Sequence, residues 1–466
     1  MDRCGHEEQG RRGRRFCDGT VIGRRSILKL IGIFPIAAAC SNGADKHGSR
    51  AARTTVSESV RTLIVEGMST DGVNRWLERN RGESVRLVGT HHSTRPIKVH
   101  SGTNIDLTKC VLIRAFEGKG NGNATVVNSD HGLGNRDIGI SSGQMYSMPG
   151  CIGKHFGFVN VRGLAVDGVT ISSCLGDFMG LFMNCENVVL ERLNWFSGTD
   201  VGEDGLHLYG GKNYLVRNCH ISSGDDALSL TVESPENEPL EKVVVENCTL
   251  SSRMASGVKL HVKSAASQAF IEDVSFNDVT ISLPKLRSGH DAVRILDERH
   301  GDSGIRRIRL NSVLADMGGG PGTGMRVHGG SDILVRGCNF VNGRGVQFWA
   351  TASNGRSVRG LDIRDTIFAG SESSNREGIV LSRCEKFSLV RLTVQNFGSA
   401  GIQLTDCRYG DLSDSTVINS GGPGILLSNV GHASVIGNAL IGTGRPVVEN
   451  GESDGNTLDR NIVSSF

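Results

Sequence analysis

A short strand pattern that repeats along the chain is the feature that most restricts its fold. Glycine or alanine is followed by an apolar, a variable and an apolar residue, and this pattern recurs between residues 180 and 427. The copies begin at Gly180, Gly205, Ala227, Gly257, Ala292, Gly324, Gly345, Gly378, Gly401 and Gly424. Their starts are 21 to 35 residues apart, and a second apolar strand type alternates with them, as at 187–190 and 243–247. Because one repeat cannot bury its own apolar face, the copies must stack, and the sequence predicts an all-β parallel β-helix.

The composition favours one long repeat domain over several globular ones. The 466 residues include 63 glycines, 9 prolines and only 5% aromatic residues, which suits many tight turns around thin aliphatic layers. The 51 basic and 49 acidic residues leave a net charge of +2, and no base-reading motif occurs. We therefore expect no nucleic-acid partner, and any attraction to an acidic substrate must be local.

The N-terminal segment has the pattern of an export signal. The pair Arg24-Arg25 precedes an apolar run at 30–39 that ends in small residues, which resembles a twin-arginine signal too short to span a membrane stably. Cys40 also fits a lipoprotein cleavage site, although Ala37 stands where leucine is usual, so lipidation is an open alternative. No other long apolar run exists, so we expect no transmembrane helix in the mature chain. The mature protein is expected to be exported: periplasmic, on the cell surface or extracellular.

A short amphipathic helix is expected to close the N-terminal end of the stack. Asp71 can cap its start and Gly82 can end it. Its apolar side consists of Val73, Trp76 and Leu77. An end cap is needed because the first coil of a solenoid otherwise exposes its apolar core. The expected organisation is an export signal at 1–40, a linker at 41–60, an N-terminal cap at 61–103 and a catalytic parallel β-helix at 104–466.

Asparagines mark the ends of several strands of the second type. Asn218 and Asn247 are expected to take left-handed conformations and to stack as a ladder. Cys185, Cys219 and Cys248 each follow an asparagine, so we expect them at equivalent places on nearby coils. Stacked buried thiols are the favoured interpretation, and a disulfide is the alternative because in-register Cα atoms lie about 4.8 Å apart. No zinc-type spacing occurs, and no metal or cofactor is expected.

The alternation of side chains assigns a face to each residue of the repeated strand. The two apolar residues face the core, and the residue between them faces outward. The outward residues, coil by coil, are Phe182, His207, Ser229, Lys259, Arg294, Arg326, Gln347, Val380, Gln403 and Leu426. The position two before the first inward residue is occupied on successive coils by Asp204, Asp226, Ser256 and Asp291. One sheet is therefore predicted to carry carboxylates beside a basic and polar stripe.

Two acidic turns, at 203–205 and 224–226, lie about one coil apart, since 226 − 204 = 22. Stacking would place the backbones of Asp204 and Asp226 about 5 Å apart, so each charge would raise the proton affinity of the other. Glycoside hydrolysis needs a carboxylic acid and a carboxylate on either side of the scissile bond. We assign Asp225 as the acid and Asp204 with Asp226 as the pair that activates water. The alternative is that these aspartates only bind the backbone of their turns.

The acidic turns resemble motifs of glycoside hydrolase family 28, the polygalacturonases and their relatives. Residues 203–205 look like the family's Asn-Thr-Asp-Gly turn, and 224–226 look like its Asp-Asp turn. Residues 292–295 are similar to the start of its Gly-Val-Arg-Ile-Lys strand. The resemblance extends over about 104–311.

This resemblance implies a fold, a reaction and residue roles. The fold would be a right-handed, pectin lyase-like β-helix, and the reaction would be hydrolysis of a pectic polymer with inversion. Asp225 would donate the proton, Asp204 and Asp226 would position the water, and Arg294 would bind a substrate carboxylate.

The chain departs from the family pattern at two positions. Ser256 stands where the family has histidine, and Leu296 stands where it has lysine. Lys259 and His207, both predicted on the outward face, are candidates to replace the lost cation and imidazole. The expected substrate-binding residues are His207, Lys259, Arg294, Asp291 and Arg326.

The leading hypothesis is an exported, monomeric glycoside hydrolase that acts on a polysaccharide containing uronic acids, without a cofactor. One alternative is a Ca²⁺-dependent polysaccharide lyase on the same fold, in which the aspartates hold the ion and Lys259 or Arg294 takes the C5 proton. Another alternative is a non-catalytic, glycan-binding β-helix whose acidic turns are only turns.

Overall fold

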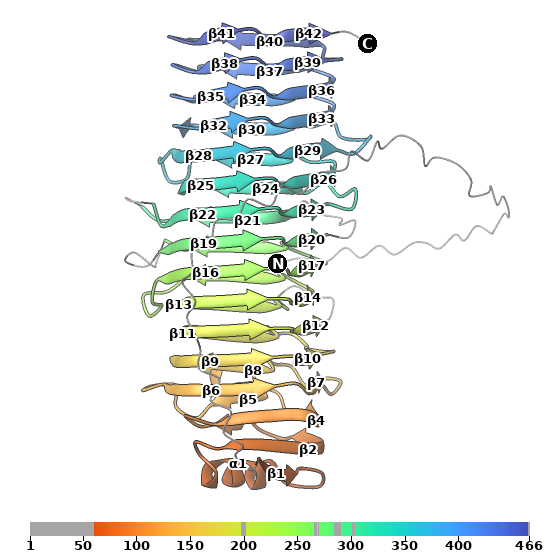
Figure 1. The fold of residues 1–466 in the computed structure, drawn as a ribbon, viewed down its shortest axis with the longest axis vertical. Coiled ribbons are helices and arrows are strands. Elements are labelled where there is room, and N and C mark those ends of the chain that lie inside the picture. The colour runs from red at the N-terminus through yellow and green to blue at the C-terminus, as the bar shows by residue number, and fades with distance from the viewer. Residues whose placement is uncertain are drawn as a thin grey trace, which may run out of the picture. The chain divides into compact units, whose positions relative to one another are not determined.

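Strands dominate the part of the chain that the computed structural model describes, which comprises residues 60–196, 202–264, 268, 270–283, 290–300 and 303–464. Within it lie α1 (Thr70–Arg79) and the 3₁₀ turn η1 (Asn121–Asn123), and the strands stack coil upon coil (Figure 1). Strands of neighbouring coils pair in parallel. The prediction of an all-β parallel β-helix is confirmed. The expected export signal and all but the last residue of the expected linker lie outside the described residues.

Three parallel sheets run the length of the stack. The first comprises β3 (Ile97–Val99), β5 (Val126–Asn128), β8 (Phe156–Val159), β11 (Gly180–Glu191), β13 (Leu206–Arg217), β15 (Leu228–Val232), β18 (Val258–Val262), β21 (Asp291–Asp297), β24 (Thr323–His328), β27 (Phe348–Thr351), β30 (Ile379–Ser382), β34 (Ile402–Thr405), β37 (Pro423–Ser428) and β40 (Arg445–Asn450). The second comprises β1 (Arg61–Ile64), β2 (Ser84–Ser93), β4 (Asn104–Arg114), β6 (Asn135–Ser141), β9 (Val161–Asp167), β11, β13, β16 (Leu240–Glu246), β19 (Ile271–Asn277), β22 (Ile305–Asn311), β25 (Ser331–Arg336), β28 (Val358–Arg364), β31 (Cys384–Glu385), β32 (Ser388–Val390), β35 (Asp411–Ser413), β38 (Ser434–Ile436) and β41 (Thr457–Asp459). The third comprises β4, β7 (Gln144–Ser147), β10 (Thr170–Ile171), β12 (Asn194–Phe196), β14 (His220–Ser223), β17 (Thr249–Ser252), β20 (Thr280–Ser282), β23 (Leu314–Asp316), β26 (Asn339–Gly343), β29 (Ile367–Gly370), β33 (Thr393–Phe397), β36 (Thr416–Ser420), β39 (Ala439–Ile441) and β42 (Ile462–Ser464).

Helix α1 packs its apolar side against the core at the N-terminal end of the stack, as predicted. Val73 and Leu77 are buried, and Trp76 packs against the core from a partly exposed position. The predicted cap residue was wrong. Ser69, not Asp71, caps the helix, because its hydroxyl accepts a hydrogen bond from the backbone N–H of Gly72. No helix among the described residues has the length and apolar character needed to cross a membrane.

The first sheet carries the repeated strand, and its register corrects two of the predicted outward residues. Phe182 pairs with Leu208 and lies in the core, while Leu181 pairs with His207. The copy that begins at Gly180 is therefore displaced by one residue, which reverses its faces.

A second displacement occurs near residue 345. Gly345 lies in the turn, so the outward partner of Arg326 is Trp349 rather than Gln347. Trp349 in turn pairs with Val380. The other predicted outward residues occupy equivalent positions on successive coils.

The asparagine ladder is confirmed. Asn218 and Asn247 both have positive φ, and the amide Nδ2 of Asn247 donates to Oδ1 of Asn218 over 2.7 Å. The equivalence of the three cysteines was wrong in part, because Cys219 stacks with Cys248 whereas Cys185 pairs with Gly211 in a different turn of the coil. The nine described cysteines are free thiols.

Candidate functional site

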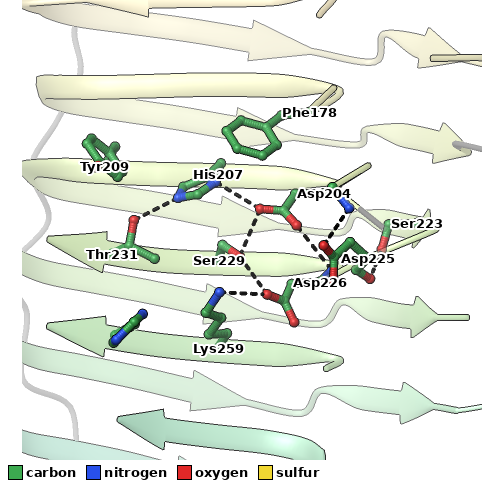
Figure 2. A network of polar contacts seen from close by, with 12 residues as sticks. Phe178, Asp204, His207, Tyr209, Ser223, Asp225, Asp226, Ser229, Thr231 and Lys259 are labelled. Atoms are coloured by element: carbon green, nitrogen blue, oxygen red, sulfur yellow. Dashed lines mark hydrogen bonds and ion pairs between the residues drawn. The ribbon is translucent and has the colours of Figure 1, made fainter. Parts of the chain in front are cut away.

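The two acidic turns lie beside each other, one coil apart, directly before strands β13 and β15 of the first sheet. The backbone N–H of Gly205 donates to the carbonyl of Asp226 over 2.9 Å, and Ala227 repeats the bond one coil further on, to Ser256, over 3.0 Å. One carboxylate oxygen from each of Asp204, Asp225 and Asp226 lies within 4.8 Å of the others. The predicted convergence of three carboxylates on one surface is confirmed (Figure 2).

Asp204 and Asp226 each use their two carboxylate oxygens for different purposes. Oδ1 of Asp204 accepts the backbone N–H of Asp226 over 3.2 Å, and Oδ1 of Asp226 accepts that of Ser256 over 2.8 Å. These bonds tie each turn to the next coil. The Oδ2 atoms face side chains of the outward stripe instead, and Ser229 lies between them, with Oγ 3.3 Å from Asp204 and 3.5 Å from Asp226. Each of the two aspartates therefore has one oxygen bound to the backbone and one oxygen that faces the side chains of the outward stripe.

The carboxylates of Asp204 and Asp226 each have a nitrogen-bearing side chain beside them. Nδ1 of His207 is 2.9 Å from Oδ2 of Asp204, a close contact that is not aligned as a hydrogen bond. The ring is held from its other side by a 2.7 Å hydrogen bond between Nε2 and Thr231, and by Phe178, whose ring centroid lies 4.5 Å away (Figure 2). Nζ of Lys259 lies 3.2 Å from Oδ2 of Asp226. Residues from three successive coils thus form one polar network, and Phe178 packs against it from a fourth.

Asp225 has a different environment from the other two aspartates. Its carboxylate accepts the backbone N–H of Gly202 over 2.6 Å. Burial, reinforced by the charges of Asp226 and Asp204, raises the pKa of Asp225 to about 6. Burial acts to lower the pKa of Lys259, but Asp226 and Asp204 outweigh it and raise that pKa above its ordinary value. The site therefore combines a carboxyl group that is readily protonated with a firmly charged ammonium group.

The backbone of Asp225 is also fixed. Its carbonyl accepts hydrogen bonds from the hydroxyls of Ser223, over 2.7 Å, and Ser252, over 2.6 Å. The Ser252 hydroxyl accepts in turn from the backbone N–H of Ala255 over 2.9 Å. These contacts hold the position of the acidic turn without using the carboxyl group.

The basic stripe continues away from the aspartates, and one predicted substrate-binding residue beside it needs correction. Lys259, Arg294 and Arg326 are paired in register on successive coils and are partly exposed. Asp291 is 0% exposed, so its assignment as a substrate-contacting residue was wrong. Its carboxylate instead binds Nε of Arg294 at 2.6 Å and Nε of Arg326 at 3.0 Å from behind, which orients both guanidinium groups toward the surface.

A second outward column, missed by the sequence analysis, runs beside the first. Tyr209, Thr231 and His261 are paired in register, two residues after the members of the first column. The Tyr209 hydroxyl donates to Glu233 over 3.5 Å, and Nε2 of His261 lies 3.1 Å from Glu298. The same alternation that identified His207 would have identified this column, had it been followed two residues further.

The two positions that depart from the family pattern lie within the same framework. Ser256 is fully buried, and its hydroxyl has no hydrogen-bond partner among the described residues. Leu296 pairs with His261 on one side and His328 on the other, in the second outward column. Lys259 and His207 already contact the acidic cluster, so a cation and an imidazole are present at other positions of the sheet.

The clustered carboxylates are the one group of possible metal ligands found among the described residues. Ca²⁺ takes six to eight oxygen ligands, and its affinity rises with the number of charged ligands. Here Nζ of Lys259 lies 3.2 Å from Asp226, so an ammonium group already contacts one of the three carboxylates. A divalent cation would compete with this lysine.

Comparison with known proteins agrees with the fold. A family model described as "Right handed beta helix region" matches residues 265–463, and no curated protein matches. Among solved structures, a family 28 exopolygalacturonase of Yersinia enterocolitica is similar at 12% identity and a TM-score of 0.52, over 86% of this chain and 79% of that one. The N-terminal fragment of bacteriophage phi29 gene product 12 is similar at 15% identity and a TM-score of 0.50, over 87% and 70%.

A third structure, the A-module of the Azotobacter vinelandii mannuronan C-5 epimerase AlgE4, matches at 10% identity and a TM-score of 0.44, over 84% of this chain and 96% of that one. At such identities the likenesses bear on the fold alone. The chain is a right-handed parallel β-helix, as the resemblance in the sequence implied.

Proposed function

We propose that the chain is a glycoside hydrolase that acts on a polysaccharide containing uronic acids. The observation that carries the proposal is the asymmetric carboxylate cluster. Asp225 has a raised pKa, while Asp204 and Asp226 face His207 and Lys259 across the site. Neighbouring carboxyl groups that lie in different environments are typical of the acid–base pairs of glycosidases.

The chemistry follows from the positions of the oxygens. Protonated Asp225 donates its proton to the glycosidic oxygen as the bond from that oxygen to the anomeric carbon breaks. A water molecule held by the Oδ2 atoms of Asp204 and Asp226 attacks the anomeric carbon and loses its proton to this pair. His207 and Ser229 hold the Asp204 carboxylate, and Lys259 holds that of Asp226. Arg294 and Arg326 lie further along the stripe, where guanidinium groups can bind substrate carboxylates.

The stereochemical outcome is a separate part of the proposal. In most inverting glycosidases the two carboxyl groups are about 6.5–9.5 Å apart, and in retaining enzymes about 5–5.5 Å. Here one oxygen of each aspartate lies within 4.8 Å of one oxygen of each of the others, a shortest contact that does not separate the two classes. The resemblance to family 28 favours inversion, and nuclear magnetic resonance of the first anomer released would decide between the two outcomes.

The test is incubation of the purified protein with pectic, neutral and sulfated polysaccharides, followed by an assay for new reducing ends. We expect cleavage of the uronic-acid polymer and its loss in Asp225→Asn. Release of reducing ends at the same rate by Asp225→Asn would refute the assignment.

A Ca²⁺-dependent lyase is the second candidate, because the three carboxylates are clustered closely enough to share a cation. A lyase produces an unsaturated sugar that absorbs in the ultraviolet, and a chelator would abolish its activity. Absorbing products together with chelator sensitivity would replace the hydrolase proposal. Binding of a glycan without any cleavage, unchanged in Asp225→Asn, would favour the non-catalytic alternative.

We also propose that the chain is exported by the twin-arginine route and acts as a monomer. The support for export is the Arg24-Arg25 pair before the apolar run. Replacing both arginines with lysine should retain the protein inside the cell, and size-exclusion chromatography of the mature chain tests the monomer.

A further inference from the structure

The outward stripe does not end at the basic residues but reaches an aromatic one. Starting from Ser229, which contacts the aspartates, register pairs lead through Lys259, Arg294 and Arg326 to Trp349. Neighbouring parallel strands are about 4.8 Å apart, so Trp349 lies about 19 Å from the acidic cluster along the same face. It stands on β27 as a partly exposed side chain.

Two adjoining hollows share Trp349, Val346 and Arg376 in their walls. The first, of about 520 Å³, is also lined by Arg326 and Arg344. The second, of about 350 Å³, lies on the side of the following coils. It is lined by the carboxylate of Glu377 and by the hydroxyl and amide side chains of Thr351, Ser382, Gln403 and Thr405. The indole therefore stands between a basic hollow and a polar one whose single carboxylate, Glu377, pairs with Arg376.

The first hollow is lined by basic side chains, two of which pair with carboxylates outside it: Arg326 with Asp291, and Arg376 with Glu377, whose Oε2 lies 3.8 Å from Nε. Three arginines line it, and its described lining contains no carboxylate. Arg326 lies over the Trp349 ring, with its guanidinium carbon 4.7 Å from the ring centroid, and is held from behind by buried Asp291. Nε of Arg344 is buried and has no hydrogen-bond partner among the described residues. Buried polar groups of this kind normally bind something, and an arginine that lacks an acidic partner favours an anion.

We propose that the hollows around Trp349 form a binding site for an acidic saccharide, separate from the carboxylate cluster. The indole offers an apolar platform for the flat face of a sugar ring. Arg344 and Arg376 would bind the carboxylate or sulfate group, and the polar side chains of the second hollow would bind sugar hydroxyls. This site does not depend on the hydrolase proposal, because a saccharide would bind here whether or not it is cleaved elsewhere.

Binding can be measured without cleavage in the full-length Asp225→Asn variant. The probes are a uronic-acid oligosaccharide and a neutral oligosaccharide of the same length, titrated by calorimetry and by tryptophan fluorescence. We expect the acidic probe to bind at least about tenfold more tightly and to change the emission of Trp349. Trp195 is fully buried, and Trp76 lies in helix α1, where it packs against the core, so neither should respond.

Single substitutions locate the site. Trp349→Ala and Arg344→Ala should each weaken binding of the acidic probe about tenfold or more, and Trp349→Phe should retain most of it. The matched control is Arg309→Ala, because Arg309 is an exposed arginine on β22 of another sheet. Equal affinity for both probes, or affinity unchanged by Trp349→Ala in a variant that keeps the wild-type circular dichroism, would overturn the proposal. Tighter binding of a single-stranded oligonucleotide than of the acidic sugar would also overturn it.

The design separates this proposal from the hydrolase proposal. If no polysaccharide is cleaved, the same titration with the unmodified protein still tests the Trp349 site. If cleavage occurs, Trp349→Ala should raise KM several-fold for long polymers that reach both sites, and leave KM for short oligomers unchanged. Equal changes for both lengths would contradict a site distant from the aspartates.

Discussion

The coils that carry the aspartates and the coils near the C-terminus share the same turn but not the same side chains. Gly205 donates its backbone N–H to the carbonyl of Asp226 over 2.9 Å, and Gly378 donates in the same way to Ala400 over 3.1 Å. On the next coil Pro423 takes this place. The turn therefore forms equally well without a carboxylate, and the aspartates are not a requirement of the fold.

The outward residues differ in the same way. In the acidic region Ser229 and Lys259 stand on adjacent coils, whereas Gln403 and Leu426 stand at the corresponding positions further along. Placing charged groups in a nearly buried site is costly unless each has a partner. Buried carboxylates also occur elsewhere, as at Asp291 and Asp297, where guanidinium groups pair with them. The described residues contain one group in which three carboxylates meet, at Asp204, Asp225 and Asp226, and such clusters are typical of functional sites.

The largest expected effect comes from removing a carboxylate of the acidic region. Asp226→Asn should lower the cleavage rate about 10²–10⁴-fold, because the water-activating pair loses one charge while the turn keeps a similar shape. The assay is the release of reducing ends from a uronic-acid polymer. Asp414→Asn, an exposed turn residue of a C-terminal coil, is the matched control and should leave the rate unchanged.

The second prediction copies the acidic turn onto a C-terminal coil. Ala400→Asp should destabilise the protein by about 2–4 kcal/mol, since Pro423 offers no N–H to the new carboxylate and Leu426 stands where Lys259 pairs with Asp226. Glu377, at the position of Asp204, would add a like charge. Urea unfolding measures the loss. Adding Leu426→Lys, which reproduces the Asp226–Lys259 pair, should recover part of the stability. Full stability of Ala400→Asp alone would show that this turn tolerates a charge without a partner.

The third prediction concerns pH and Asp225. Its pKa is raised to about 6, so the folded protein binds this proton more tightly than the unfolded chain does. Ionised Asp225 destabilises the folded state. This destabilisation is absent below about pH 3.9, where the group is protonated in both states, and reaches its full size above about pH 6. Asp225→Asn should therefore unfold at a higher temperature than the wild type at pH 7.5, and at nearly the same temperature at pH 3.5.

The cleavage rate should follow the same titration. If Asp225 is the general acid, kcat/KM should fall about tenfold per pH unit above about pH 6. A rate that stays constant between pH 6 and pH 8 would remove Asp225 from that role, whatever its effect on stability.

The smallest effects are expected in the basic stripe. Lys259→Ala should cost about 1 kcal/mol of stability, because the ammonium group is partly exposed and solvent screens its pair with Asp226. Lys259→Ala and Arg294→Ala should each raise KM several-fold for an acidic substrate and less for a neutral one. Equal changes for the two substrates would argue against carboxylate recognition by this stripe.

Much of the fold was predictable because it depends on local and periodic features. The repeated Gly-apolar-variable-apolar strand predicted the coils, and the asparagine turns predicted the ladder at Asn218 and Asn247. The errors arose where the pattern is displaced. Gly180 stands one residue later in the register than Gly205, since it pairs with Leu206, and Gly345 lies in a turn. Phe182 and Gln347 were therefore assigned to the outward face in place of Leu181 and Trp349.

The sequence by itself determined that the chain would coil and that Asp204, Asp225 and Asp226 would meet, because both follow from the spacing of residues along a period of known length. Only the tertiary structure decided what each group contacts. One oxygen of Asp226 accepts a hydrogen bond from the backbone of Ser256, and the other contacts Lys259. Both partners lie on the next coil. Burial of Asp291, and the hollows that share Trp349, depend on side chains packed from several coils at once, and no repeat pattern records such packing.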